Sequence, residues 1–402
     1  MSIYLDRETI SPETGRLGTR FLLYPQVPHL AGYEKPETVW ISTSPNEIQP
    51  GPADRRMYVA DPLFEKPVYE YPFQPPFNGE QHPPAEAGPD GHFDHLDPSS
   101  RQFVCAHVFA SLRRVLDIWE SYLGHEIIWH FSQTYERLEI IPFVNWNNAQ
   151  SGYGYMEFGT ELNDQETVYP YALNFDVIAH EFGHALIFAE MGTPVGGSAN
   201  REYFGYHESV SDMIALISLL HFDSVLDRLL RSTRGNLLTM NELNRIAELS
   251  GDRQIRTASN DRKMSTVTDS VHDLSKPFTG AIFDTLIEIY HHNAVDGNLV
   301  DLPESVSHDR LFELDHHEIE LIGHRFADAF NAREFLLKSA LANARDLMGS
   351  AIARSWSALN PDTLNYALAG AAIADQLDAL GNSAAGDILM ENLAWREILV
   401  RT

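Results

Sequence analysis

The stretch FDVIAHEFGHALIFAE, Phe175–Glu190, contains the motif HEFGH. On an α-helix with about 3.6 residues per turn, His180 and His184 lie one turn apart on one face, and Glu181 lies about 100° around the helix from His180. Two imidazoles in these positions can share one metal ion, and zinc binds imidazole nitrogen at about 2.0–2.1 Å. The stretch therefore predicts a helix that carries two metal ligands and, in Glu181, a base that can take a proton from a bound water.

Chance has to be weighed, because 18 of the 402 residues are His. An HExxH string would arise at random in roughly one such sequence in twenty. Two partial copies of the motif serve as internal controls. GHEIIWH, residues 124–130, separates its histidines by five positions, which turns the second about 140° away from the first. HHEIEL, residues 316–321, has Leu321 where the second His would stand. We interpret both copies as ordinary surface segments.

A third ligand is expected in GYHESVSDMIALISLL, residues 205–220. Glu208 and Asp212 are one turn apart at the expected start of an amphipathic helix, so both carboxylates can point to one side. Glu208 is the candidate ligand. Asp212 is the candidate residue that orients a ligating imidazole through its second ring nitrogen. The alternative is that both are ordinary acids of a first helical turn, favoured there by the helix dipole.

Composition limits the classes of protein that this chain can represent. A chain of 402 residues with 44% hydrophobic content can bury a large core, and we expect two lobes. A formal net charge of -28 repels phosphate backbones and anionic lipid, so we expect neither nucleic-acid nor membrane partners. Cys105 is the only cysteine, which excludes an internal disulfide.

The first residues, MSIYLDRETISPETGRLG, lack a basic region followed by an apolar stretch. No run of about 18 apolar residues occurs anywhere in the chain. With the single cysteine, these features favour a cytoplasmic protein without a membrane span. Secretion by a leaderless route, or trimming of a leader, would leave the same sequence pattern.

The chain divides into three expected regions. Residues 1–100 are proline-rich, which predicts extended chain, turns and a few edge strands, in an accessory or pro-like segment. Residues 101–195 form an expected α/β lobe with a helix closed by Gly124 and the HExxH helix. Residues 196–402 form an expected helical lobe with the third ligand. Three strand-like runs lie in the α/β lobe: HEIIWHF at 125–131, LEIIPFV at 138–144 and YGYMEFG at 153–159.

The order HExxH and then Glu-x-x-x-Asp resembles the thermolysin-like zinc metallopeptidases, the gluzincins that include the fungalysins. The resemblance spans residues 100–370 and implies a two-lobed α+β fold. That fold has a small β-sheet lobe with an edge strand, a mainly helical C-terminal lobe and a zinc helix between them. It also implies one catalytic Zn²⁺ on His180, His184 and Glu208. The acidic stretches that bind calcium in secreted members are not evident after Glu208, so structural calcium is not expected.

Other segments resemble the family's substrate-binding regions. NNAQSGYGYMEFG, residues 147–159, is similar to the edge strand whose Asn-Ala pair binds substrate backbone. RTASND, residues 256–261, is similar to the segment with the substrate-binding arginine, and DSVH, residues 269–272, to the loop with the histidine that stabilises the transition state. The resemblance thus implies these roles for Asn148, Ala149, Arg256 and His272, with Asp269 orienting His272 and either Tyr203 or Tyr206 as the catalytic tyrosine.

These expectations together predict a zinc endopeptidase that cleaves a peptide or protein substrate with Glu181 as general base. One alternative is a zinc aminopeptidase, because GYMEF resembles the strand on which such enzymes anchor the substrate amine, here with Glu157. A second alternative is an inactive, zinc-stabilised binding protein. The sequence does not indicate an oligomeric state.

Overall fold

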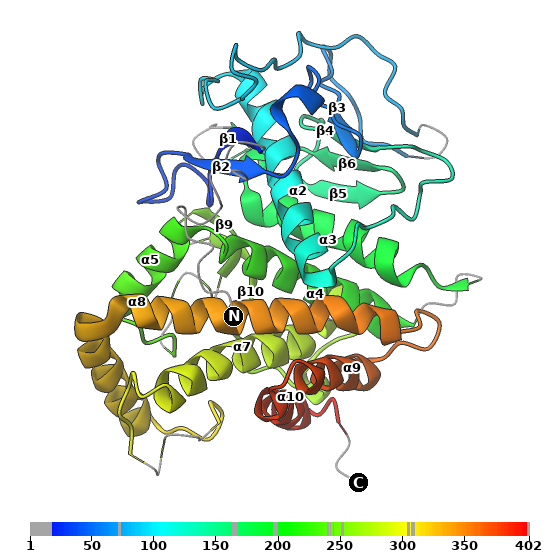
Figure 1. Cartoon of the computed structure of the whole chain (residues 1–402). Coiled ribbons are helices and arrows are strands. Elements are labelled where there is room, and N and C mark those ends of the chain that lie inside the picture. The colour runs from blue at the N-terminus through cyan, green and yellow to red at the C-terminus, as the bar shows by residue number, and fades with distance from the viewer. Residues whose placement is uncertain are drawn as a thin grey trace. The chain divides into compact units, whose positions relative to one another are not determined.

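The computed structural model has the mixed α+β fold that the sequence predicts, with a small sheet and a mainly helical C-terminal part (Figure 1). It describes residues 18–70, 74–162, 168–195, 200–238, 241, 243, 245–250, 253–303, 306 and 310–399, and of these only the backbone for 161–162, 168, 245–250 and 253–257. The chain forms two compact units. Unit 1 comprises Met1–Ser121, His125–Ala189 and Ala247–Arg253, and unit 2 comprises Tyr122–Gly124, Glu190–Ile246 and Gln254–Thr402.

The main sheet of unit 1 has the strand order β3-β4-β6-β5. Its strands are β3 (Met57–Val59), β4 (Leu138–Ile141), β6 (Tyr155–Phe158) and β5 (Ala149–Gly152). β4 is parallel to β3 and to β6, whereas β5 is antiparallel to β6 and lies at the edge. β4 and β6 are buried along their whole length, as expected for central strands that are covered on both faces. The predicted edge strand is confirmed.

Two smaller strand pairs complete unit 1. β1 (Thr19–Leu23) and β2 (Glu37–Ile41) form an antiparallel pair in which Phe21 lies opposite Val39. β7 (Thr160–Leu162) and β8 (Val168–Pro170) form the second antiparallel pair. The strands and turns expected in the proline-rich region are therefore present in its described part. One of these strands, β3, belongs to the main sheet. The accessory or pro-like role of this region stays a prediction.

The first long helix, α2 (Arg101–Leu123), ends directly before Gly124, as expected. Its apolar side chains recur at helical spacing and are buried, among them Val108, Leu112 and Val115. Gly124 follows with φ of 78°, the left-handed conformation that commonly ends a helix.

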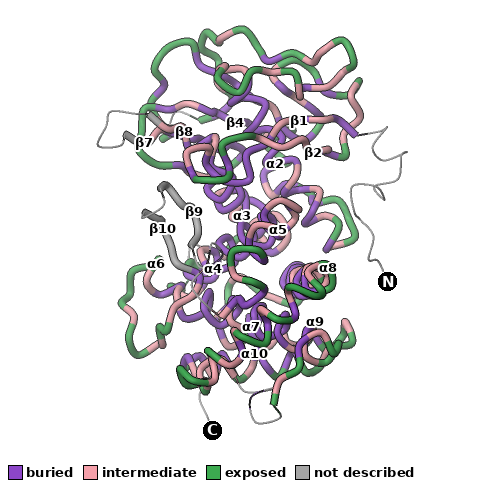
Figure 2. Tube along the Cα trace, turned by 90° about the vertical axis from the view of Figure 1, so that its left-hand side faces the viewer, coloured by how far each residue is buried: buried purple, intermediate pink, exposed green. Residues whose placement is uncertain are grey.

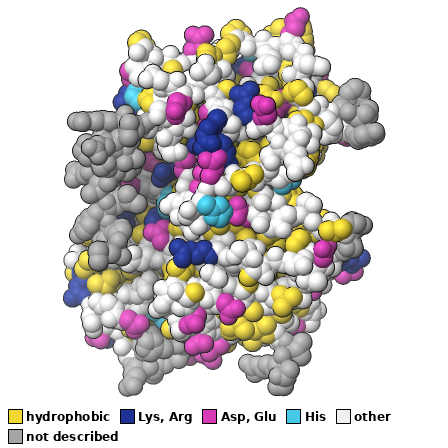
Figure 3. All heavy atoms as spheres, turned by 45° about the vertical axis from the view of Figure 1, so that its right-hand side comes forward, with side chains coloured by type: hydrophobic (Ala, Val, Ile, Leu, Met, Phe, Trp, Pro, Cys, Tyr) yellow, Lys and Arg dark blue, Asp and Glu magenta, His cyan; other side chains and the backbone are white. Residues whose placement is uncertain are grey.

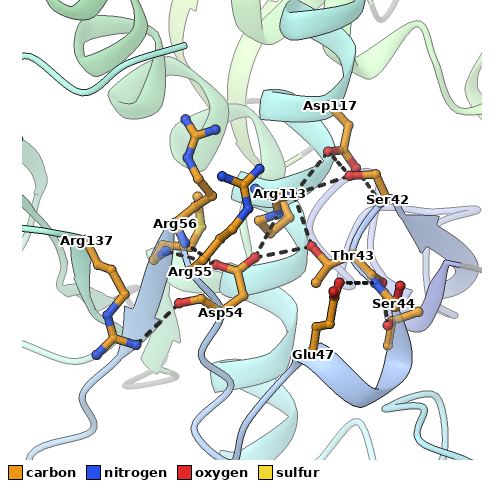
Figure 4. Close-up of polar contacts among 12 residues, drawn as sticks. Ser42, Thr43, Ser44, Glu47, Asp54, Arg55, Arg56, Arg113, Asp117 and Arg137 are labelled. Atoms are coloured by element: carbon orange, nitrogen blue, oxygen red, sulfur yellow. Dashed lines mark hydrogen bonds and ion pairs between the residues drawn. The ribbon is translucent and has the colours of Figure 1, made fainter. Parts of the chain in front are cut away.

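A buried arginine joins α2 to the loops before β3 (Figure 4). The guanidinium of Arg113 forms an ion pair with Asp54 at 3.2 Å and donates to the hydroxyl of Thr43 at 3.1 Å. The side chains of Arg113 and Asp54 are 6% and 2% exposed, so the buried charge of Asp54 needs the guanidinium beside it. Arg113 also forms an ion pair with Asp117 at 3.4 Å. Asp117, one turn later on α2, accepts from Ser42 N–H and Oγ.

One strand prediction is wrong. Residues 125–131 form turns and irregular chain, although Ile127, Trp129 and Phe131 are buried. Side chains satisfy the backbone here in place of a strand partner: Arg56 donates to the carbonyl of Ile127, and the indole of Trp129 donates to the carbonyl of Arg56. Alternating burial by itself does not distinguish such a segment from a strand.

The HExxH stretch forms α3 (Phe175–Met191), as predicted, after a short 3₁₀ turn η2 (Tyr171–Leu173). Unit 2 then contains six longer helices and the short α6 (Val271–Leu274) among its described residues. The longer ones are α4 (Arg201–Leu219), α5 (Asp223–Thr233), α7 (Lys276–Asp296), α8 (His316–Ser355), α9 (Tyr366–Ala379) and α10 (Ser383–Trp395). Strands β9 (Arg245–Ser250) and β10 (Arg253–Thr257) pair with each other.

The helix that contains Glu208 begins earlier than the sequence predicts. α4 begins at Arg201, where the side chain of Asn200 accepts from the N–H of Tyr203 at 2.8 Å as an N-cap. It ends at Leu219, and α5 is a separate helix. Glu208 therefore lies in the interior of α4, which removes the interpretation of this residue as an ordinary first-turn acid.

The core of unit 2 is formed mainly by α7, whose residues are buried around most of its circumference (Figure 2). Phe278 on α7 stacks on Tyr366 of α9, with ring centroids 5.0 Å apart and planes within 8° of parallel. α10 packs on α7 and α9, where Asp284 and Arg396 form a buried ion pair. α8 is interrupted at Arg333, whose φ of -147° is not helical.

Acidic and basic side chains lie close to one another on the face drawn in Figure 3, although the whole chain is strongly acidic. Within the part of the chain that is described, no helix has both the length and the apolar character needed to cross a bilayer.

A buried carboxyl group in unit 2 makes stability depend on pH. Burial raises the pKa of Glu288 from its ordinary 4.5 to about 7, against the opposing hydrogen bond from Asn392 and the charge of Arg310. The folded state therefore holds this proton more tightly than the unfolded state. Its contribution to stability is present below pH 4.5 and is lost as the pH rises toward 7, a change on the order of 3 kcal/mol.

We therefore expect Glu288→Gln, which keeps the shape and cannot ionise, to be less sensitive to pH than the wild type. Urea unfolding of both proteins at pH 5 and pH 8 measures this, with the wild type losing more stability at the higher pH. Glu86→Gln is the control, because Glu86 is exposed and lies in unit 1, whereas Arg310 lies in unit 2. Identical pH dependence of wild type and Glu288→Gln would contradict the assignment.

Candidate metal centre

Apolar packing and two polar contacts within unit 1 fix the helix that bears the HExxH motif. Phe175, Ile178 and Phe182 on α3 are fully buried. Asn174 caps the helix by accepting from the N–H of Val177 at 3.2 Å. In the first turn, Asp176 accepts from the amide of Gln26 at 2.9 Å. These contacts set the rotation of α3 and with it the directions of its histidines.

A buried histidine of α2, His107, supports the turn that precedes α3. His107 on α2 contacts the carbonyl of Ala172 through Nδ1 at 2.9 Å and accepts at Nε2 from the N–H of Tyr24 at 3.1 Å. Burial lowers the pKa of His107 to about 4, so the ring is neutral at neutral pH. The ring thus acts here as a structural hydrogen-bonding group.

His180 and His184 are neighbours on α3, as the spacing of four predicts. Their ring centroids are 4.9 Å apart and their planes are nearly perpendicular, at 89°. His180 is buried, and His184 and Glu181 are partly buried. Each of His180, His184 and Glu208 offers one ligand atom, and these three atoms all lie within 4.8 Å of one another. Two imidazole nitrogens and a carboxylate oxygen form a donor set that suits zinc and other first-row divalent ions.

The environment of Glu208 is formed within unit 2 by α4 and the segment around α6. Ser209 Oγ donates to the carbonyl of Ser275 at 2.8 Å, and Tyr366 Oη donates to the carbonyl of Leu274 at 3.0 Å. Gly205 allows this approach, because a Cβ there would lie 2.0 Å from Tyr366 Oη. The two hydrogen bonds hold the end of α6 beside α4.

The same arrangement brings His272 to Glu208. Nδ1 of His272 lies 3.0 Å from Oε2 of Glu208, and the His272 side chain is 65% exposed. His272, expected in a loop, lies on the short helix α6. The carboxylate of Asp269 forms an ion pair with Arg201 at the exposed start of α4, and its expected role toward His272 stays a prediction. Asp212 lies one turn after Glu208 and is 3% exposed.

The remaining predicted residues lie on three elements. Asn148 is exposed directly before β5, and Ala149 is the buried first residue of that strand. Arg256 lies on β10, where the structure describes the backbone and not the side chain. Tyr203 and Tyr206 are both buried on α4, and burial raises the pKa of the Tyr203 hydroxyl to about 12 and that of Tyr206 further.

The backbone of the edge strand is suited to pair with an added strand. The carbonyl of Asn148 accepts from the N–H of Gly159 at 2.9 Å and therefore points toward β6. Successive carbonyls of an extended chain point to opposite sides, so the carbonyl of Ala149 points to the open edge of the sheet. A Cβ on Gly159 would lie 1.9 Å from the carbonyl oxygen of Trp146, so only glycine allows the chains to approach this closely.

Glu157, the residue of the aminopeptidase alternative, has several partners inside unit 1. Its side chain is fully buried, forms an ion pair with Lys66 and accepts from the N–H of Tyr69 at 2.9 Å and the amide of Gln150 at 2.7 Å. No sequence motif marks Lys66 or Gln150. The contact with Lys66 joins residues 91 positions apart, and a sequence without aligned relatives gives no signal for such a pair.

HHEIEL lies largely at the surface as expected, whereas GHEIIWH does so only in part, because Trp129 is buried and His130 is half-buried. Glu126 of GHEIIWH forms a two-pronged ion pair with Arg55, and the ring of His130 lies among aromatic rings such as that of Phe188. In HHEIEL, Glu318 forms a capping box with Asp315 at the start of α8.

No protein-family profile matches the sequence, and the search of curated proteins found no match. Among solved structures, the chain is similar to the precursor of protealysin, a metalloproteinase from Serratia proteamaculans. The two share 12% sequence identity with a TM-score of 0.48, over 88% of this chain and 91% of that chain. The function proposed below rests on the site residues.

If the three grouped side chains bind a metal ion, removing one of them should weaken binding at least about 100-fold, since loss of a residue that only supports a ligand already costs about 10–100-fold. We expect this for His184→Asn, measured by zinc titration against a competing chelator. His317→Asn, an exposed histidine in the HHEIEL string, is the matched control. Equal affinity of His184→Asn and the wild type would contradict the assignment.

Proposed function

We propose that this chain is a zinc-dependent endopeptidase. The observation that carries the proposal is the grouping of His180, His184 and Glu208, with Glu181 next to the first ligand on α3. A zinc ion held by these side chains would polarise a peptide carbonyl and lower the pKa of a water molecule to about 7. The three ligands leave a fourth position free, as catalytic zinc sites do.

The residues of the chain then have separate tasks. Glu181 takes the proton of the attacking water and delivers it to the leaving amine. His272 donates a hydrogen bond to the oxyanion that develops on the scissile carbonyl, together with Arg256. The contact of His272 with Glu208 supports this task, because it places the imidazole beside a proposed ligand. Asp212 orients a ligating imidazole, and Asn148 with the carbonyl of Ala149 aligns the substrate along β5.

Two observations favour an endopeptidase over the alternatives. An amine anchor has to be reached by the substrate N-terminus, whereas Glu157 is fully buried and already bonded to Lys66, Tyr69 and Gln150. A structural zinc site usually has four protein ligands and needs no base. Within the described residues the group has three ligands, and Glu181 follows the first of them.

Substitution of the base should separate catalysis from metal binding. We expect Glu181→Gln to lower kcat for an internally quenched peptide by about 10²–10⁴-fold, the usual contribution of a general base, while its zinc content equals that of the wild type. Turnover and zinc content are measured on the same samples. Turnover of Glu181→Gln within a few-fold of the wild type would exclude the mechanism.

The type of peptidase is tested with matched peptides that differ only in N-terminal acetylation. Because we propose that Glu157 does not bind a substrate amine, acetylated and free peptides should be cleaved at the same internal bonds with kcat/KM within about threefold. Mass spectrometry of the products identifies the bonds. Loss of cleavage on acetylation would instead support the aminopeptidase.

A further inference from the structure

The edge strand β5 contains little that fixes its own register. It has four residues, Ala149–Gly152, and only Ala149 is buried. A slip of one residue in a strand moves every side chain to the opposite face of the sheet, and short strands of small residues resist such slips weakly. The side chains that oppose β5 on its neighbour β6 must therefore hold it in place.

Two cross-strand pairs on one face of the sheet do so. Gln150 lies directly opposite Glu157, and its amide donates to Glu157 Oε2 at 2.7 Å. Gly152 lies directly opposite Tyr155, whose ring covers it so closely that a Cβ on Gly152 would lie 2.1 Å from a ring carbon. A shifted register would lose the hydrogen bond and place a side chain against this ring.

A segment from the proline-rich region, residues 66–69, holds both β6 partners. The ammonium of Lys66 forms an ion pair with Glu157, and the N–H of Tyr69 donates to the same carboxylate. The Tyr69 ring packs edge-on against the ring of Tyr155, with centroids 4.9 Å apart. Tyr69 Oη also donates to Glu139 on β4 at 2.6 Å. The contacts extend in this way from the 66–69 segment across three strands.

Burial makes these contacts depend on one another. The side chains of Lys66 and Glu157 are 6% and 0% exposed. Lys66 Nζ also lies 3.4 Å from the centroid of the Tyr69 ring and donates to the carbonyl of Pro67 at 3.0 Å. A buried carboxylate with a buried ammonium beside it has a fixed position, because moving either charge leaves the other uncompensated. Glu157 is thus a rigid acceptor for Gln150.

We infer that Gln150, held by Glu157 and Lys66, is a positioning residue for peptide binding at β5. This inference rests on the proposed function, because it assumes that the substrate pairs with the open edge of this strand. Gln150 does not touch the reacting atoms. It fixes the register in which Asn148 and the carbonyl of Ala149 face the substrate, so it acts on substrate binding and not on the chemical step.

The test uses the full-length zinc-loaded chain with Gln150→Met, which keeps the length of the side chain and removes its amide donor. We expect KM for the internally quenched peptide to rise about tenfold, the effect of losing one hydrogen bond to a charged group, with kcat within about twofold of the wild type. Hydrogen exchange of the β5 amides should become at least about tenfold faster, while the unfolding temperature changes little.

Gln133→Met is the matched control, because it makes the same exchange at an exposed position in a turn outside the sheet. It should leave KM and amide exchange unchanged. Unchanged exchange in Gln150→Met, or a fall in kcat without a rise in KM, would overturn the positioning role. If the wild type cleaves no peptide, the proposed function and the use of β5 as a peptide site fail together. Faster exchange in Gln150→Met would then still support the register-fixing role of Gln150.

Discussion

The candidate site depends first on the burial of α3. This helix is apolar on most of its surface, and its fully buried side chains, such as Ile178, Phe182 and Leu186, leave it little freedom to rotate. A helix held in this way presents His180 and His184 in fixed directions. The two side chains are therefore positioned by the protein itself, without a metal ion. Little conformational entropy would then be lost if an ion bound, which is the advantage of a preorganised site.

Local sequence patterns were sufficient for the elements that are defined locally. Apolar periodicity predicts the helices α2 and α3. Gly124 was predicted to close α2, and it does so in the left-handed conformation that glycine adopts easily. The start of α4 could also have been predicted, because Asn200 is a strong N-cap residue. Patterns failed at residues 125–131, where long-range side-chain contacts with Arg56 decide the backbone conformation.

The same distinction between local and long-range interactions applies to the residues of the candidate site. The spacing of four within HEFGH and within ESVSD set His180 beside His184, and Asp212 one turn after Glu208, because helical geometry is local. Contacts between distant segments were not accessible in this way. The pairing of Asp269 with Arg201 and the contact of Lys66 with Glu157 depend on tertiary packing, and an acidic residue in a sequence does not specify which of many cations it will meet.

The glycine that follows β6 limits how this region can diverge. With the carbonyl of Trp146 so close to Gly159, no other amino acid fits there without displacing the chain before the edge strand. Tyr153, which follows that strand, is 45% exposed, so a substitution there meets less steric restriction than one at position 159. A library of variants in this region should therefore keep position 159 as glycine.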